Sequence, residues 1–143
     1  MSWRPERPWR VAVLYGGASA ERTMRPNFIC IGAVAAAIGI GTGAFGAHGL
    51  RGVIGAAELS LWDTGTRYWL IGSLGMLLFG LFQGKRDVSA VPGWLLLAGS
   101  LLFSVSLYAL ALGAPRAIGA VTPFGGLGLM AGFLSFAWAA RRR

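Results

Sequence analysis

Residues 28–47, FICIGAVAAAIGIGTGAFGA, form a run of twenty amino acids without a single charge. As a helix this run is about 30 Å long at about 1.5 Å per residue, which matches the hydrocarbon thickness of a bilayer. Its small residues recur at every fourth position, as in Gly39, Gly43 and Ala47, so another helix can approach its backbone closely. The run therefore predicts a membrane-spanning helix that packs against a neighbour.

The composition of the whole chain is that of a membrane protein. Of its 143 residues, 55% are hydrophobic and only 13% are charged, whereas about 25% are charged in soluble proteins. The length suits one domain. The single cysteine, Cys30, can form no internal disulfide, and we interpret it as a small apolar packing residue.

Further apolar segments follow the first at residues 66–83, 93–112 and 117–140. The turns GKRDVSAVP and GAPRAIG between them are short enough to make consecutive helices antiparallel. We therefore predict an all-α, integral membrane four-helix bundle for residues 27–143, surrounded by the lipid bilayer.

The longest polar interruption separates the first two predicted helices. Its segment 55–65 has Leu59 and Trp62 three positions apart, with Glu58 and Asp63 beside them. This pattern predicts a short amphipathic helix in the loop, which either lies on the membrane surface or covers the bundle.

The basic residues predict the orientation. Of the thirteen Lys and Arg residues, ten lie in the N-terminal segment, the loop between the second and third helices, and the C-terminal tail. The opposite side has only Arg51, Arg67 and Arg116. Because basic loops stay in the cytoplasm, both termini are expected to be cytoplasmic, in the inner (cytoplasmic) membrane of a bacterium.

The same orientation assigns the tryptophans and the role of the positive charge. Trp94 and Trp138 are expected at the inner membrane interface, and Trp62 and Trp69 at the outer one. The basic residues lie at segment ends, where they determine topology and touch anionic headgroups, so nucleic acid is not an expected partner.

Residues 1–26 are predicted to be a basic N-terminal extension. A secretory signal is the less favoured alternative, because cleavage after Ala20 would leave Arg22 and Arg25 on the exported side of a membrane helix. The stretch RVAVLYGGASAER resembles the first strand and glycine turn of D-alanine–D-alanine ligases, but nothing else of that enzyme follows. Met24 is an alternative functional start.

Four motifs in order resemble one bacterial family: GAFGAHGL, TGTRY, GWLLLAGSLLFSVSLYALAL and VTPFGGLGLMAG. They are similar to the domain of unknown function 423 family, which is related to the animal transmembrane protein 256-like proteins. The resemblance covers about residues 27–140 and implies a small integral membrane protein without a defined biochemical role. That family has a histidine shortly after its Arg-Tyr pair, where this chain has Ile71 and Gly72, so no role of that imidazole is carried over.

Helices of alternating direction bring several polar residues to the same, outer face of the membrane. The candidate binding residues there are His48, Arg67, Tyr68, Tyr108 and Thr122. Two readings of His48 stay open besides the favoured one, in which it hydrogen-bonds the loop and ends the first helix: a metal or pigment ligand, and a proton carrier. Arg67 is expected to pair with Asp63 or Glu58 and to hold the loop on the bundle, or else to bind an anion or lipid headgroup.

Other residues are expected to have structural roles. Ser100, Ser104 and Tyr108 form a polar stripe, which usually joins helices by hydrogen bonds rather than lining a pore. The predicted structural residues are Gly39, Gly43, Asp63, Pro123, Gly125 and Gly126, of which the last three suggest a kinked or unwound start of the fourth helix.

The residues contain no phosphate-binding loop, no metal-ligand spacing and no nucleophile beside a base, so we expect neither an enzyme nor a cofactor or metal. The favoured function is that of a non-catalytic structural or accessory subunit, packed in a homo-oligomer or a larger membrane complex. The alternative is binding or transport of a small anion or lipid headgroup at the outer polar cluster.

Overall fold

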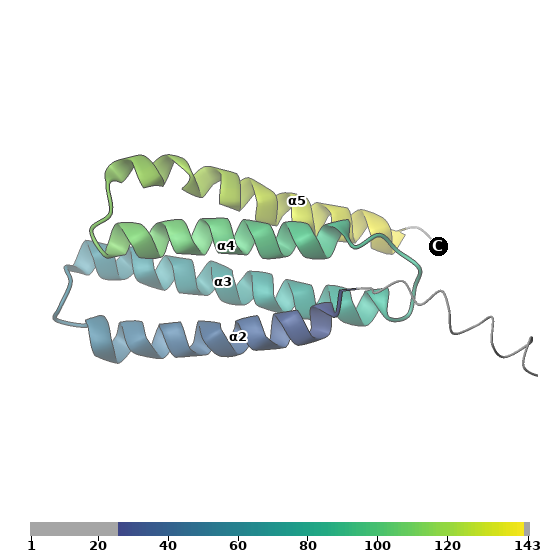
Figure 1. Ribbon diagram of the computed structural model, residues 1–143, viewed down its shortest axis with the longest axis horizontal. Helices are drawn as coiled ribbons and strands as arrows, with labels where there is room; N and C mark the ends of the chain where they lie inside the picture. The colour runs from purple at the N-terminus through teal and green to yellow at the C-terminus, as the bar shows by residue number, and fades with distance from the viewer. Residues whose placement is uncertain (1–25, 142–143) are drawn as a thin grey trace, which may run out of the picture.

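The computed structural model describes residues 26–141, and this part of the chain is built from four long antiparallel helices (Figure 1). The helices are α2 (Phe28–Phe45), α3 (Ala56–Gln83), α4 (Val91–Ala111) and α5 (Thr122–Arg141). A π-helical turn follows α2 at Gly46–Leu50, and a 3-10 helix precedes α5 at Arg116–Ala120. The predicted all-α four-helix bundle is confirmed. Apart from Pro26, the predicted basic extension lies outside the described residues.

Each end of the bundle has its own set of connections. The loop end contains residues 51–55 and 112–115, which join α2 to α3 and α4 to the 3-10 helix. The terminal end contains residues 84–90, together with the start of α2 and the end of α5. At the loop end Gly52 and Gly113 have φ angles of +82° and +89°, a region that glycine adopts without strain, so these two glycines allow the turns.

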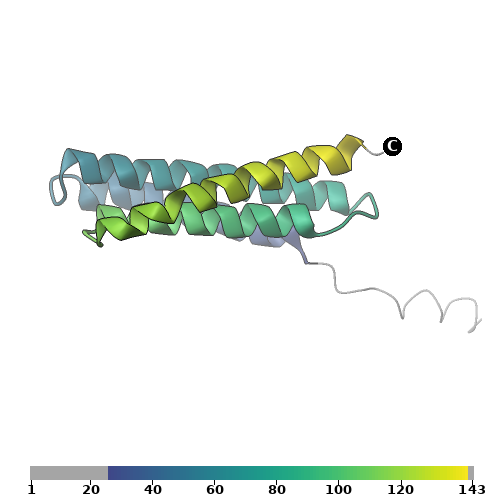
Figure 2. The same cartoon turned by 90° about the horizontal axis from the view of Figure 1, so that it is seen from above.

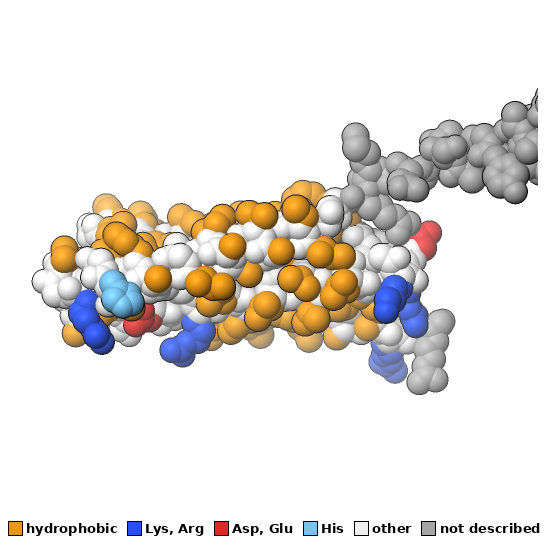
Figure 3. Space-filling view, turned by 90° about the horizontal axis from the view of Figure 1, so that it is seen from below, with side chains coloured by type: hydrophobic (Ala, Val, Ile, Leu, Met, Phe, Trp, Pro, Cys, Tyr) orange, Lys and Arg blue, Asp and Glu red, His pale blue; other side chains and the backbone are white. Residues whose placement is uncertain are grey.

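Within residues 26–141, three helical segments are long and apolar enough to cross a membrane by length and composition: Phe28–Leu50, Val91–Ala111 and Arg116–Arg141. The remaining helix, α3, carries charged side chains in its first half. It nevertheless joins the end of α2 to the start of α4 at the opposite end of the bundle, so it runs alongside both (Figure 1). Apolar side chains cover the middle of the surface, and charged ones gather toward its two ends (Figure 3).

The separate amphipathic helix predicted for residues 55–65 is wrong, because this segment is the first part of α3. Only residues 51–55 lie outside helices between α2 and α3. The helix is continuous because Trp62, Thr66, Ser73 and Met76 form one buried stripe on both sides of Gly65, at spacings of three to four residues or a multiple of them. A helix that ended at Gly65 would break this stripe.

The core lies between α3 and α4, and the outer helices close it from two sides. Its buried side chains are Phe28, Ala35, Met76, Phe79, Leu96 and Leu129. Helix α2 packs along α3 and helix α5 packs along α4, while Phe136 of α5 also contacts the rings of Phe79 and Phe82 on α3. Seen from above, α5 crosses the other helices obliquely (Figure 2).

Glycines on α2 allow its backbone to approach α3 closely. A Cβ atom at Gly32 would lie 2.7 Å from the backbone nitrogen of Leu77, and one at Gly39 would lie 2.6 Å from the side chain of Leu70. Gly43 faces Thr66 in the same interface, with a Cβ position 3.3 Å from its Cγ2. In contrast, Gly41 has open space around it. The small residues of α2 therefore fall on two different faces.

The start of α5 is regular and is fixed by close contact with α4. Pro123 occupies the first turn of α5, where its missing N–H group costs no helical hydrogen bond. A Cβ atom at Gly125 would collide with the backbone of Phe103 on α4, while Gly126 lies beside the ring of Phe103. The helix is thus not unwound at these glycines, because they serve close packing.

Candidate functional site

Four hydroxyl-bearing side chains meet between α2, α3 and α4 near the loop end, and we call them the hydroxyl cluster: Thr42, Thr66, Ser104 and Tyr108. The Tyr108 hydroxyl donates a hydrogen bond of 3.1 Å to Thr66 Oγ1 and lies 3.4 Å from Thr42 Oγ1. Ser104 Oγ donates a bond of 2.7 Å to the backbone carbonyl of Gly65. Three helices are therefore joined through one tyrosine and its neighbours.

Two tryptophans extend this network. The indole N–H of Trp62 donates a 2.9 Å hydrogen bond to the carbonyl of Thr42, and its ring centroid is 4.4 Å from that of Tyr108. Trp69 donates in the same way to the carbonyl of Ala35, at 2.6 Å. Each indole therefore joins α3 to α2, and Trp62 is only 7% exposed, while the depth of both at the outer membrane interface stays a prediction.

His48 lies on the π-helical turn after α2 and is exposed. Its Nδ1 atom is 3.0 Å from the backbone carbonyl of Ala44, one turn earlier in the chain. The imidazole thus helps to end the helix, as the sequence favoured. Within residues 26–141, no group of three or more histidine, cysteine, aspartate or glutamate side chains is arranged to hold a metal ion.

Arg67 and Tyr68 lie on the outside of α3 rather than in the hydroxyl cluster. Arg67 is exposed, and among the described residues no carboxylate oxygen lies within 4.0 Å of its guanidinium, so the predicted ion pair with Asp63 is not formed. Asp63 is exposed as well. Tyr68 is 41% exposed, and its ring contacts Phe103 with centroids 4.7 Å apart.

Thr122 belongs to a different helix interface. Its hydroxyl oxygen lies 2.8 Å from Ser106 Oγ, and this pair joins α5 to α4. Of the predicted serine stripe, Ser104 bonds across to α3, whereas Ser100 bonds back to the carbonyl of Leu96 in its own helix at 2.7 Å. The stripe therefore joins helices in part, as predicted for such a pattern.

The five candidate binding residues share one end of the bundle but no common pocket. Tyr108 is half-buried, Thr122 lies between α4 and α5, and the other three are exposed. In the described part of the chain, every fully buried side-chain nitrogen or oxygen has a hydrogen-bond partner. Sequence reasoning missed Thr42 and Thr66 as members of the cluster. Their only signal was a threonine on each of two helices, which does not indicate which way either side chain points.

Comparisons with known proteins agree with this fold. A family described as "Protein of unknown function (DUF423)" matches residues 42–126. A UPF0382 membrane protein of Staphylococcus epidermidis is 44% identical over 108 residues, covering 75% of this chain and 88% of the relative. The UPF0382 membrane protein YwdK of Bacillus subtilis is 39% identical over 116 residues, covering 79% and 94%. No solved structure matches the chain.

Replacing Tyr108 by Phe tests the role of the hydroxyl cluster. The substitution keeps the ring but removes the donor to Thr66, so we expect a loss of about 0.5–1.5 kcal/mol in the free energy of unfolding. Unfolding in mild detergent, followed by circular dichroism, measures this loss. Tyr68→Phe is the matched control, because that hydroxyl has no bond to a described residue, and equal stability of the two variants would contradict the assignment.

Proposed function

The chain belongs to the DUF423 family of membrane proteins, and from that premise we propose that it is a non-catalytic structural or accessory protein. It packs against further copies of itself or against a larger membrane complex. The observation that carries this proposal is the complete pairing of the fully buried polar side chains within residues 26–141. Groups that bond one another hold helices together and leave no polar surface inside the bundle for a substrate.

The outer face of α2 supports association with another helix. Ala33, Ala37 and Gly41 recur at every fourth position on this face and are exposed, whereas Gly32 and Gly39 are covered by α3. In a bilayer, apolar side chains gain little by leaving lipid, so helices associate where small residues permit close packing. The face formed by Ala33, Ala37 and Gly41 meets that requirement.

Self-association is tested with Gly41→Ile. The added side chain meets no atom of its own chain, so the fold is expected to persist, while a close helix contact at this position is lost. We expect oligomers of the wild-type protein in native mass spectrometry and predominantly monomers of the variant. Ala131→Ile on the exposed side of α5 is the matched control. A wild-type protein that is only monomeric, and that co-purifies with no partner from its native membrane, would end the proposal.

A second candidate function is supported by the exposure of Arg67. Arg67 is eleven positions from the start of α3, or about 16 Å along the helix, and has no described carboxylate partner. A lipid-facing guanidinium is costly unless it reaches a negative group, so its long side chain is suited to an anion or lipid headgroup. This alternative needs only Arg67 and not the four other residues that the sequence placed beside it.

The alternative is tested with Arg67→Ala in a variant shown to be folded by circular dichroism. We expect a decrease in bound anionic lipid, or in anion flux into vesicles, of about tenfold for a lost charged hydrogen bond. Arg51→Ala, at the loop end, is the control for a general loss of positive charge. Binding and flux that are the same in the wild type and in Arg67→Ala would exclude this function.

The proposed location is the inner (cytoplasmic) membrane of a bacterium, with both termini in the cytoplasm. The terminal end of the bundle carries Lys85, Arg86 and Arg141, and the sequence adds five arginines before α2 and two after α5. Among the described residues, the basic ones at the loop end are Arg51, in the α2–α3 connection, and Arg116, at the start of the 3-10 helix. The positive-inside rule then places the terminal end in the cytoplasm.

Reporter insertions test this orientation. Alkaline phosphatase, which is active only outside the cytoplasm, is expected to be inactive after Arg143 and active when inserted at Gly52 in the loop end. A green fluorescent protein fused after Arg143 is expected to fluoresce. The reverse pattern of activities would contradict the assignment.

A further inference from the structure

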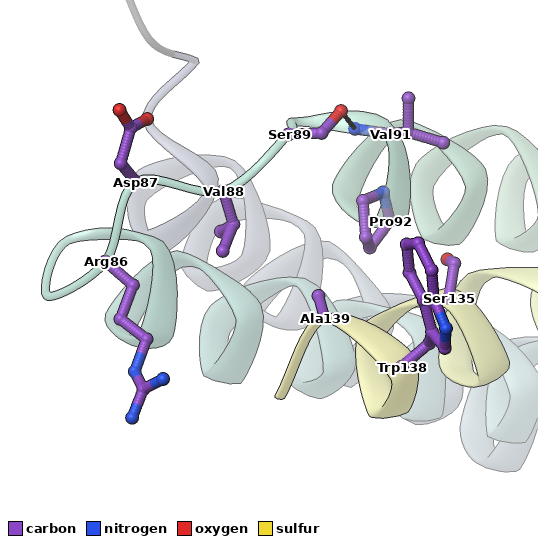
Figure 4. A pocket seen from close by; sticks show the side chains of 9 residues that line it. All are labelled: Arg86, Asp87, Val88, Ser89, Val91, Pro92, Ser135, Trp138 and Ala139. Atoms are coloured by element: carbon purple, nitrogen blue, oxygen red, sulfur yellow. Dashed lines mark hydrogen bonds between the residues drawn. The ribbon is translucent and has the colours of Figure 1, made fainter. Parts of the chain in front are cut away.

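A groove opens at the terminal end of the bundle, between the α3–α4 connection and the last turns of α5 (Figure 4). It encloses about 730 Å³. Helix α4 contributes Val91 and Pro92 to its wall, and helix α5 contributes Ser135, Trp138 and Ala139. None of these residues belongs to the hydroxyl cluster, which lies near the opposite end of the bundle.

We propose that this groove binds an anionic glycerophospholipid, with acyl chain against its apolar wall and phosphate near Arg86. The apolar part of the wall is formed by valine, proline, tryptophan and alanine side chains, which suit hydrocarbon. The α3–α4 connection, the start of α4 and the last turns of α5 surround the space that such a chain fills.

The position of the groove is that of a membrane interface. Trp138 in its wall is 58% exposed, and Trp94, one turn into α4, is 50% exposed. Exposed tryptophans at helix ends are typical of the headgroup level of a bilayer. A groove at this level admits a lipid sideways from the membrane, with its headgroup on the water side.

The charges at this end favour an anionic lipid over a neutral one. Lys85, Arg86 and Arg141 carry positive charge, while Asp87 is the acidic residue at the rim. Arg86 and Asp87 extend from the rim in different directions (Figure 4). Arg86 also lies over the ring of Phe82, with 5.6 Å between its Cζ atom and the ring centroid, and its planar guanidinium group matches the geometry of a phosphate.

Two serines at the groove are already engaged within the chain. Ser135 Oγ donates to the carbonyl of Gly132 at 2.9 Å, and Ser89 Oγ accepts from the backbone N–H of Val91 at 3.3 Å. The second bond lies at the start of α4, so the positive dipole end of that helix lies at the groove. Recognition of a headgroup then depends on Arg86 and the surrounding positive potential rather than on hydroxyl groups.

The test uses the full chain in mild detergent, with equal amounts of phosphatidylglycerol and phosphatidylcholine, and native mass spectrometry as the readout. The wild-type protein is expected to retain phosphatidylglycerol in preference. Arg86→Gln should decrease that retention about tenfold, to the level of phosphatidylcholine. Ala139→Phe, which fills the groove, should decrease retention of both lipids. Arg51→Gln at the loop end is the matched control and should bind as the wild type does.

Three outcomes would overturn the proposal, provided that thermal unfolding shows each variant to be folded. They are equal retention of the two lipids by the wild type, unchanged retention in Arg86→Gln, and unchanged retention in Ala139→Phe. A dimer without bound lipid that Ala139→Phe abolishes would assign the groove to a second copy of the chain and would also contradict lipid binding. Gly41 does not line the groove, so Gly41→Ile is expected to retain lipid even where it loses self-association. This variant therefore tests the two proposals separately.

Discussion

The close approach of neighbouring helix backbones is the constraint on which this structure depends. In a bilayer, an apolar side chain gains little by moving from lipid to protein, so helices adhere through dense packing and hydrogen bonds between them. Gly32 and Gly39 bring α2 onto α3, and Gly125 brings α5 onto the backbone of α4. At these distances short side chains such as Ser104 and Thr122 reach across an interface. The hydrogen bonds of the bundle thus require the glycines.

This constraint also accounts for the direction in which the polar side chains between the helices point. The Tyr108 hydroxyl and the Trp62 indole are directed at groups on neighbouring helices, where each pairing joins two elements of the bundle. What faces outward is mostly apolar, with Asp63 and Arg67 as charged exceptions along α3 and with the basic residues at the terminal end. Functions that involve surfaces, namely association with helices and lipids, therefore fit this chain better than chemistry in an interior pocket.

Much of the fold could be predicted from the sequence, because uncharged length and charge placement define spans directly. For the candidate site, the sequence predicts only that its residues share one end of the bundle. It does not predict which side of each helix they occupy. Arg67 and Thr66 are adjacent in the chain, yet one is exposed and the other buried, since consecutive helical residues point about 100° apart. The orientation of α3 about its own axis cannot be predicted without knowing how it packs against neighbouring helices. Without known helix contacts, the sequence also does not show that α3 continues through Gly65. A glycine is equally consistent with a helix end and with a close helix contact.

The central claim, that interior polar groups are used to join helices, is tested most directly by hydrogen exchange at the tryptophan side chains. In nuclear magnetic resonance spectra of the protein in detergent, the indole protons of Trp62 and Trp69 report their bonds to Thr42 and Ala35. Trp94, which is 50% exposed at the terminal end, is the internal reference. The account predicts exchange at Trp62 and Trp69 that is much slower than at Trp94. Exchange at the same rate at all three positions would contradict it.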